Sequence, residues 1–384
     1  MKIAFDAKRA YQNATGLGHY SRTLISSLAA FYPGYHYYLC APRITDRFDI
    51  AHCTHVENVI PKDFFSKKLT SFWRSNWVKK DLQEKGINIY HGLSNEIPAG
   101  IQKTTIRSVV TIHDLIFERY PKQYNCTDVQ IYRRKFKNAC KNADHIIAIS
   151  MQTKEDLINF YKIPEGKITV CYQSCNPAFA EAVSEYEKDR IKQLYHLPDR
   201  FFLYVGSITE RKNLLNICKA LHIVKEKLDI PLVVIGDGGN YKKRVKDFIT
   251  QNNLKVQVIF LSEKEAAKNS AGYKSSADFP AIYQLSAGVI YPSFFEGFGL
   301  PVLEALWSKV PVITSNISCL PETGGDAAYY VNPHLPEEIA EGMTKLASDK
   351  TLVREMKEKG WLHAQNFTPQ KCAADVRQVY LRLL

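Results

Sequence analysis

A glycine-rich segment in the second half of the chain carries two carboxylates at a defined spacing. Glu296 precedes the glycine turn, Glu304 follows eight positions later, and Pro301 stands where a helix would begin. Free backbone N–H groups at such a turn bind anions, a diphosphate among them. The loop carboxylate can accept hydrogen bonds from sugar hydroxyls, and the helical one from both ribose hydroxyls, although a plain turn with two solvated glutamates is the alternative. The predicted turn consists of Gly297, Phe298, Gly299 and Leu300.

Two adjacent cations, Arg211 and Lys212, stand before another helical pattern. Cations at a helix start are unfavourable beside the positive end of the helix dipole unless an anion lies there. Arginine also offers the bidentate geometry that suits phosphate. The pair therefore predicts a diphosphate site, with two solvated surface cations as the alternative. Gly206 precedes the pair at the end of a strand pattern, and Gly236 follows the next strand pattern, where a plain turn would look the same.

Polar residues and glycines also follow strand patterns in the first half. Gly16 and Gly18 open a helix and let the backbone approach a bound group closely. A dinucleotide-binding fingerprint would need a further glycine where Ser21 stands, which disfavours a dehydrogenase. His113 could hydrogen-bond a sugar hydroxyl, and Asp114 could orient the imidazole or bind an acceptor.

The Glu296–Glu304 element, together with residues 310–316 and 320–328, resembles the signature of the GT-B retaining glycosyltransferases of family 4, the glycosyl transferases group 1. The resemblance covers essentially the whole chain. It implies a metal-independent transferase in which Glu296 contacts the transferred sugar, Glu304 the donor ribose, and Arg211 with Lys212 the departing diphosphate. It also implies that His113 contacts the donor sugar.

The similar proteins act as mannosyl- or other hexosyltransferases in surface polysaccharide assembly. The resemblance thus implies a GDP- or UDP-linked donor, a saccharide or lipid-linked acceptor and no further cofactor. The chain departs from the pattern at residues 262–278, a segment longer than usual beside the expected base pocket. The base, the sugar, the acceptor and the oligomeric state therefore stay open.

Short apolar runs separated by helix-length amphipathic stretches supply the framework for these residues. Such alternation predicts an α/β fold with parallel sheets covered on both faces. The fold expected here is GT-B, two Rossmann-like doubly wound domains facing across a cleft, with ligands at the carboxyl ends of the strands. The expected strands lie at 2–7, 35–41, 88–93, 108–115, 145–150, 168–174, 201–207, 231–237, 256–262, 287–293, 310–316 and 327–333.

With 384 residues the chain is too long for one ordinary core. We expect an acceptor-binding domain at 1–180, a linker at the charged stretch 181–200, and a nucleotide-sugar-binding domain at 201–365. A terminal helix at 366–384 is expected to pack back on the first domain. No apolar run is long enough to span a bilayer, and the nine cysteines lack metal-site spacing, which favours free thiols in the cytoplasm.

The net charge of +12 is concentrated in the first 195 residues, which hold 28 basic and 19 acidic residues. A basic half favours anionic partners such as phosphates or a membrane surface. The stretch 62–83 places Phe65, Leu69, Phe72, Trp73 and Trp77 on one helical stripe. Such a stripe fits a helix that packs on the sheet better than one that contacts an anionic membrane. Membrane contact, the alternative, would place the enzyme at the inner face of the membrane.

The motifs together predict an enzyme that transfers a hexosyl residue from a nucleotide sugar. A sugar-nucleotide epimerase or a phosphorylase on the same fold is one alternative. A basic nucleic-acid-binding protein is another, without any recognised motif to support it, and an inactive scaffold is a third. No metal site is predicted, because the chain lacks an Asp-x-Asp triplet.

Overall fold

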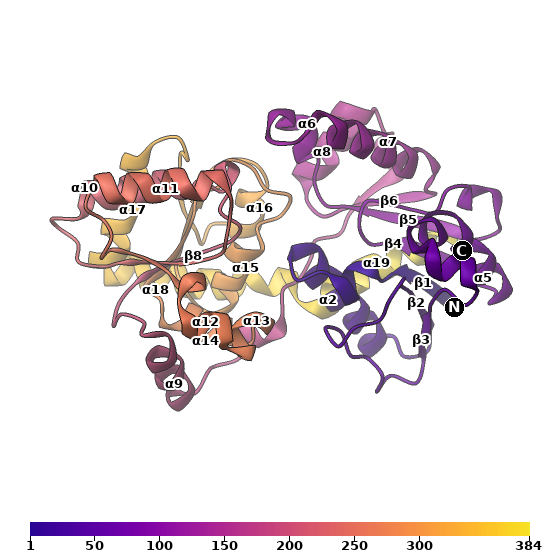
Figure 1. The fold of residues 1–384 in the computed structure, drawn as a ribbon, viewed down its shortest axis with the longest axis horizontal. Coiled ribbons are helices and arrows are strands. Elements are labelled where there is room, and N and C mark those ends of the chain that lie inside the picture. Colours follow the sequence, from indigo (N-terminus) through magenta and orange to yellow (C-terminus); the bar gives the residue numbers. More distant parts are fainter. The chain divides into compact units, whose positions relative to one another are not determined.

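The computed structural model describes residues 1–384, which divide into two compact α/β units. Unit 1 comprises Met1–Cys175 together with Phe367–Leu384, and unit 2 comprises Asn176–Asn366. Each unit has its own parallel sheet with helices packed on it (Figure 1). The expectation of two doubly wound parallel-sheet domains is confirmed.

Unit 1 contains a seven-stranded parallel sheet in the order β3-β2-β1-β4-β5-β6-β7. The order reverses between β1 and β4, so the carboxyl ends of these two strands form the edge where open α/β sheets bind ligands. The strands are β1 Lys2–Asp6, β2 His36–Cys40, β3 Val56–Val59, β4 Ile89–Gly92, β5 Arg107–Ile112, β6 His145–Ala148 and β7 Ile168–Val170.

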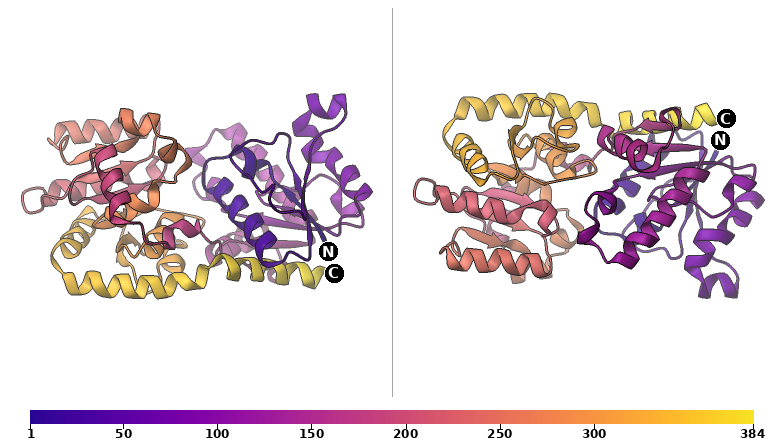
Figure 2. Two further views of the ribbon diagram at one scale, coloured as in Figure 1. Left: turned by 90° about the horizontal axis from the view of Figure 1, so that it is seen from below. Right: turned by 90° about the horizontal axis from the view of Figure 1, so that it is seen from above.

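Helices pack on the sheet of unit 1, and the terminal helix α19 (Pro369–Leu383) packs against α2 (Gly16–Phe31). Both chain ends therefore belong to unit 1, and they lie close together in both views of Figure 2. The other helices are α1 Lys8–Gln12, α3 Phe64–Lys68, α4 Thr70–Phe72, the π-helical turn η1 Trp73–Trp77, α5 Val78–Glu84, α6 Ile116–Arg119, α7 Cys126–Asn142 and α8 Met151–Tyr161.

Unit 2 contains a six-stranded parallel sheet in the order β10-β9-β8-β11-β12-β13. Its order reverses between β8 and β11, so the residues that follow these strands share one edge of the sheet. Fully buried apolar side chains such as Leu203, Val234 and Ile313 make the strands near-continuous hydrophobic runs. The strands are β8 Phe202–Val205, β9 Leu232–Ile235, β10 Val258–Phe260, β11 Gly288–Tyr291, β12 Val312–Ser315 and β13 Tyr329–Val331.

The helices of unit 2 cover this sheet, and the chain reaches them through the 3-10 turn η5 (Pro177–Ala180). The helices are α9 Glu185–Tyr195, the 3-10 turn η6 Glu210–Lys212, α10 Leu214–Val224, α11 Asn240–Gln251, α12 Glu265–Asn269, α13 Ala271–Ser275, α14 Phe279–Leu285, α15 Leu300–Trp307, α16 Leu320–Gly324, α17 Pro336–Ser348 and α18 Lys350–Ala364. No helix in the chain combines the length and apolar content needed to cross a bilayer.

Twelve of the thirteen strands fall in the twelve expected runs, with β5 beginning one residue early. The thirteenth, β3, was not expected, because Glu57 and Asn58 are exposed on this edge strand and leave no apolar run. The expected linker at 181–200 is different in the structure. It contains α9, which packs on α14 within unit 2, because Ile191 and Tyr195 are buried there.

The aromatic stretch 62–83 also differs from the single helix expected. It divides into α3, α4, η1 and α5, so that Trp73 is buried and donates from Nε1 to Asp81 Oδ2 at 2.8 Å, whereas Phe65, Leu69 and Phe72 are exposed. Packing on the sheet therefore explains Trp73 and not the other three side chains. The helical run is interrupted at Leu69, whose φ of −105° and ψ of 50° are not helical, so the 3.6-residue period on which the prediction depended does not continue from Phe65 to Trp73.

Candidate functional site

The glycine turn of unit 2 connects β11 to α15. Gly299 has a φ of 101°, a left-handed conformation that favours glycine, and a Cβ there would lie 2.8 Å from Leu320 Cδ2. Pro301 occupies the first turn of α15, as expected. Thr323 Oγ1 donates a hydrogen bond to the carbonyl of Phe298 and holds the turn from the side of α16.

Arg211 and Lys212 lie in the 3-10 turn η6, one residue before α10. Asn213, which separates them from α10, donates from Nδ2 to the carbonyl of Pro292 at 2.9 Å and to that of Pro333 at 2.7 Å. The carbonyl of Arg211 accepts a hydrogen bond from the Phe294 N–H at 2.8 Å. These contacts join η6 to the residues that follow β11, so two motifs about 85 positions apart form one site.

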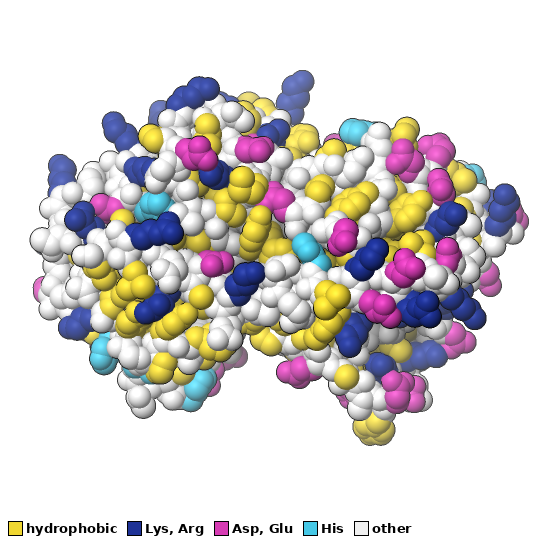
Figure 3. All heavy atoms as spheres, turned by 180° about the vertical axis from the view of Figure 1, so that it is seen from behind, with side chains coloured by type: hydrophobic (Ala, Val, Ile, Leu, Met, Phe, Trp, Pro, Cys, Tyr) yellow, Lys and Arg dark blue, Asp and Glu magenta, His cyan; other side chains and the backbone are white.

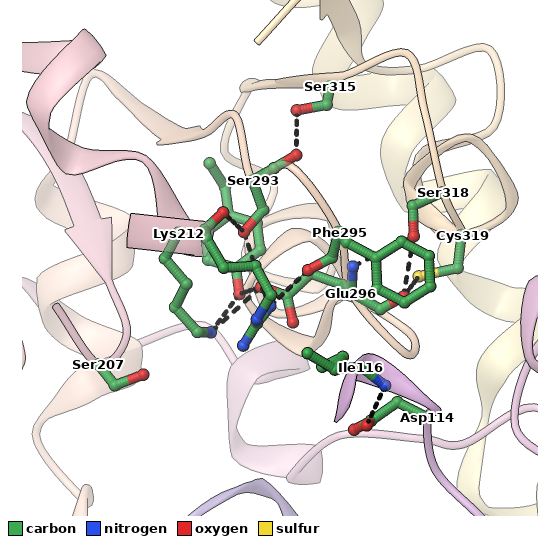
Figure 4. Close-up of polar contacts among 12 residues, drawn as sticks. Asp114, Ile116, Ser207, Lys212, Ser293, Phe295, Glu296, Ser315, Ser318 and Cys319 are labelled. Atoms are coloured by element: carbon green, nitrogen blue, oxygen red, sulfur yellow. Dashed lines mark hydrogen bonds and ion pairs between the residues drawn. The ribbon is translucent and has the colours of Figure 1, made fainter. Parts of the chain in front are cut away.

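The carboxylate of Glu296 lies at the centre of this site (Figure 4). Its Oε1 accepts hydrogen bonds from Tyr291 Oη at 2.8 Å and Ser293 Oγ at 2.7 Å. The same oxygen lies 2.7 Å from Arg211 Nη1 and 3.4 Å from Lys212 Nζ. One carboxylate oxygen is therefore held by four donors, and Figure 4 draws none of these contacts to the other.

The backbone of Glu296 is held as firmly as its side chain. Ser318 Oγ accepts from the Glu296 N–H at 3.1 Å and donates to the Glu296 carbonyl at 2.9 Å. Cys319 Sγ contacts the same carbonyl at 3.1 Å. Figure 4 shows both side chains approaching Glu296 from the chain that follows β12. The Glu296 carboxylate is thus oriented both by contacts to its side chain and by contacts to its backbone.

The charges of this cluster leave a net positive site. Burial raises the pKa of Glu296, but Lys212, Arg211 and the bonds from Ser293 and Tyr291 outweigh it and bring the pKa to about 2. Burial lowers the pKa of Lys212, which Glu296 counteracts. With Glu296 ionised and both cations charged, the cluster carries one positive charge. Such a site can hold an anion, and its carboxylate cannot serve as a proton donor near neutral pH.

Glu304 lies in α15 and is largely buried. Burial raises its pKa to about 7, although a hydrogen bond from Tyr283 Oη to Oε2 at 2.7 Å and the charge of Lys212 both lower it. The carboxylate is therefore close to its titration point at neutral pH. A ligand that donates hydrogen bonds to it would favour the ionised form.

Gly206 and Gly236 follow β8 and β9 and touch each other. A Cβ on Gly236, whose φ is 147°, would lie only 1.9 Å from the carbonyl oxygen of Gly206. Ser262 Oγ donates to the carbonyl of Gly236 at 2.6 Å, which attaches the start of the long 262–278 segment to this turn. Close backbone packing already accounts for both glycines.

His113 follows β5 at the carboxyl edge of the unit 1 sheet. Its Nε2 lies 2.8 Å from the carbonyl of Leu93, which can only accept, so Nε2 carries the proton. Burial lowers the pKa of His113 to about 4, so the imidazole is neutral and Nδ1 is an acceptor. Tyr20 of α2 packs its ring edge-on at 4.7 Å. The side chain is thus oriented to receive a hydrogen bond, such as one from a hydroxyl.

The remaining candidates of unit 1 have structural partners. Asp114 Oδ1 accepts a hydrogen bond at 3.1 Å from the N–H of Ile116, the first residue of α6. Gly16 and Gly18 lie in the first turn of α2, as expected. His91 is buried in the sheet, and its Nδ1 lies 2.6 Å from Tyr380 Oη.

Sequence patterns did not identify the residues that support these sites. Tyr291 and Ser293 belong to the turn segment but were not assigned a role, and Tyr283 lies in a helix with no distinguishing motif. Asp6 at the end of β1 pairs with Arg74, which also pairs with Glu96. The sequence shows Asp6 at the end of the first expected strand, which is a signal for a charged cluster there. Its basic partner lies 68 positions away and was not detectable.

Two family models match consecutive parts of the chain. The one described as Glycosyltransferase Family 4 matches residues 14–179, and the one described as Glycosyl transferases group 1 matches residues 185–362. The boundary between the two matches falls a few residues after the boundary between the two units.

Two curated relatives come from Escherichia coli. The O-antigen chain mannosyltransferase B is 24% identical over 396 aligned positions, which cover 99% of each chain. The serotype-specific mannosyltransferase WbdA is 28% identical over 313 positions, 78% of this chain and 36% of that protein, so the alignment spans about a third of WbdA. Among solved structures, HepE of Anabaena in complex with UDP-glucose matches with a TM-score of 0.74 and 16% identity over 100% of both chains.

Proposed function

Because the chain belongs to the glycosyltransferases of family 4 and group 1, which have the GT-B fold, we propose that it transfers a hexosyl residue from a nucleoside diphosphate sugar to a hydroxyl of a saccharide or lipid-linked acceptor. The relatives favour mannose as the sugar. The proposed reaction retains the anomeric configuration and needs no divalent metal. The observation that carries it is the Glu296 cluster, in which two cations and one ionised carboxylate lie together at a glycine turn.

The donor is proposed to bind in unit 2. Arg211 and Lys212 take its diphosphate, and the Glu296 carboxylate accepts a hydrogen bond from a hydroxyl of the sugar. The ionised carboxylate of Glu304 accepts hydrogen bonds from both ribose hydroxyls. The backbone that completes the donor site is provided by Gly206, Gly236, Gly297, Phe298, Gly299 and Leu300.

The chemistry follows from the charges. The bond between the sugar C1 and the diphosphate oxygen breaks, and the negative charge that grows on the diphosphate is stabilised by Arg211 and Lys212. The acceptor oxygen attacks C1 from the same face, and a diphosphate oxygen takes its proton. Glu296, with its low pKa, stays ionised and positions the sugar. These two cations supply the positive charge that a metal would supply elsewhere.

The acceptor is proposed to bind at the carboxyl edge of the unit 1 sheet. His113 would accept a hydrogen bond from the donor sugar through Nδ1, while Gly16, Gly18 and Asp114 lie on the loops that follow β1 and β5. An acceptor carried on a lipid would place the enzyme at the inner face of the membrane.

The proposal leaves open whether the donor is a GDP-sugar or a UDP-sugar. The relatives are mannosyltransferases, whereas HepE binds UDP-glucose. The 262–278 segment is attached to the Gly236 turn through Ser262 and packs on α9, where Tyr195 Oη donates to Ser270 Oγ at 2.8 Å. We propose that this segment shapes the base pocket.

Thermal unfolding against GDP-, UDP- and ADP-sugars tests the donor class. A nucleotide sugar present at 100 times its Kd should add about 2.7 kcal/mol of stability. Product analysis with the stabilising donor then tests the reaction, because transfer requires an acceptor and an epimerase does not. Stabilisation by no sugar nucleotide, or a rearranged donor formed without acceptor, would contradict the proposed function.

A further inference from the structure

Four large apolar side chains are exposed within nine residues of unit 1. Phe64, Phe65, Leu69 and Phe72 are 65%, 67%, 52% and 46% exposed. Phe64 and Phe65 lie on α3, Phe72 lies on α4, and Leu69 connects these two short helices. Single exposed apolar residues are common on protein surfaces, but a contiguous group of them marks an interaction site.

The exposure of this segment follows from how its ends are held. Asp63 Oδ1 accepts from the Ser66 N–H at 2.9 Å and caps α3, and Ser66 itself is buried. After α4, Trp73 is buried, and Arg74 pairs with Asp6 at the carboxyl end of β1. The inner face is thus occupied by polar and aromatic residues with partners. Ser66 and Trp73 take the buried positions of this segment, and the four apolar side chains are exposed.

The charges around these side chains are almost all positive. Lys62, Lys67 and Lys68 are exposed, and the Lys68 ammonium lies 4.6 Å from the centre of the Phe64 ring. Asp63 is the one acid between residues 60 and 72, and its carboxylate is engaged as the cap of α3. Aromatic and aliphatic tips surrounded by lysines match the boundary between acyl chains and anionic headgroups. Lysine stems can lie along the apolar surface while their ammonium groups reach the phosphates.

Some of the basic residues elsewhere stand apart or are paired with acids. On the face drawn in Figure 3, lysine and arginine side chains stand mostly apart, among acidic and uncharged groups. In α7, Arg133 pairs with Glu118 and Lys135 with Glu96. The segment 61–72 therefore combines apolar exposure with unopposed positive charge.

We propose that the segment 61–72 docks the enzyme on an anionic lipid membrane, with Phe64, Phe65, Leu69 and Phe72 inserted among the lipids and the lysines on the lipid phosphates. This docking goes beyond the transfer reaction and does not depend on it. It uses the chain itself and requires neither donor nor acceptor.

Flotation of the full-length protein with vesicles tests the proposal. The vesicles contain either phosphatidylcholine alone or phosphatidylcholine with about one third phosphatidylglycerol, and no substrate is added. The protein should bind the anionic vesicles at least tenfold more tightly than the neutral ones. Raising the salt from 0.1 M to 1 M shortens the Debye length from about 10 Å to about 3 Å and should weaken binding by about tenfold.

A triple variant, Phe64→Ser with Phe65→Ser and Leu69→Ser, should lose at least tenfold of this binding. The matched control replaces three side chains of unit 1 that are 43–48% exposed, as Phe31→Ser, Ile44→Ser and Ile131→Ser, and should bind like the parent protein. Thermal unfolding and nucleotide-sugar binding, measured on both variants, check that each is folded.

Equal loss in the two triple variants, or no vesicle binding by the parent protein, would overturn the proposal. Equal binding to neutral and anionic vesicles would overturn the assignment of an anionic partner. Because vesicle binding is measured without substrate, its failure would leave the proposed transfer reaction untouched, and failure to bind any nucleotide sugar would leave the docking surface untouched.

Discussion

Replacing Glu304 by glutamine should stabilise the ligand-free enzyme and weaken donor binding at the same time. Glu304 is largely buried beside Tyr283, which can donate to a glutamine oxygen as it does to the carboxylate. The ordinary pKa of this carboxyl is 4.5, and burial raises it to about 7 in the folded protein. The folded state therefore retains a proton that the unfolded state has lost between these two pH values.

The sign and size of the effect follow from that difference. Between pH 4.5 and about 7 the folded protein binds more protons than the unfolded chain, so the contribution of Glu304 to stability falls as the pH rises. The two pKa values differ by about 2.5, and one pKa unit corresponds to 1.36 kcal/mol, which gives at most about 3 kcal/mol. Glu304→Gln should remove this loss. The variant should match the parent protein below pH 4.5 and be more stable by up to about 3 kcal/mol at pH 8.

Donor affinity should change in the opposite sense. If ribose hydroxyls donate to ionised Glu304, binding of a nucleotide sugar releases a proton below pH 7. The affinity of the parent protein should then rise by up to tenfold per pH unit between pH 5 and 7, whereas that of Glu304→Gln should be weaker and independent of pH in this range.

Denaturant unfolding at pH 5 and pH 8 and calorimetric titration with the stabilising nucleotide sugar measure both effects. The exposed residue Glu358 provides the control, as Glu358→Gln. An unchanged free energy of unfolding for Glu304→Gln at pH 8 would refute the burial argument. A pH dependence of affinity that persists in Glu304→Gln would refute the ribose role.

Three further outcomes are expected at the donor site. Arg211→Ala or Lys212→Ala alone should weaken nucleoside diphosphate binding by roughly ten- to a hundredfold, because a hydrogen bond to a charged group is worth about 1.5–3 kcal/mol. The double variant should abolish nucleoside diphosphate binding. Unchanged affinity in a folded double variant would exclude the diphosphate role. Ser293→Ala should lower kcat/KM about tenfold by loosening Glu296, with no change in nucleoside diphosphate affinity, and Ser348→Ala on the exposed face of α17 should behave like the parent protein. Transfer should persist in excess EDTA, so a complete loss that Mn²⁺ or Mg²⁺ restores would contradict the metal-independent mechanism.

Local patterns in the sequence predicted the framework because parallel strands are buried on both faces. Runs such as Leu232–Ile235 are apolar throughout, and the sequence marks them whatever their neighbours are. The edge strand β3 is the exception, since Val56–Val59 has two exposed polar residues. The glycine turn before α15 was also local, because Gly299 and Pro301 each have a conformational preference of their own.

Hydrophobic periodicity was less reliable for predicting which face of a helix is buried. The stripe from Phe65 to Trp77 has helical spacing, but the helix is interrupted at Leu69, and Trp73 is buried while Phe65 is exposed. The charged stretch 181–200 looked like a linker because its composition is polar. Two buried residues, Ile191 and Tyr195, are enough to attach α9 to unit 2.

The sequence by itself determined which residue types stand at the carboxyl ends of the strands, and so indicated Arg211, Lys212, Glu296 and Glu304. Only the tertiary structure decided how they pair. Glu296 shares one oxygen among four donors because β8 and β11 are neighbours in the sheet, which brings residues 84 or 85 positions apart into contact. The tertiary structure also sets the pKa values of the two carboxylates. Burial by itself raises both. Two cations beside Glu296 lower its pKa to about 2, whereas Glu304 has only Lys212 and its pKa stays raised at about 7.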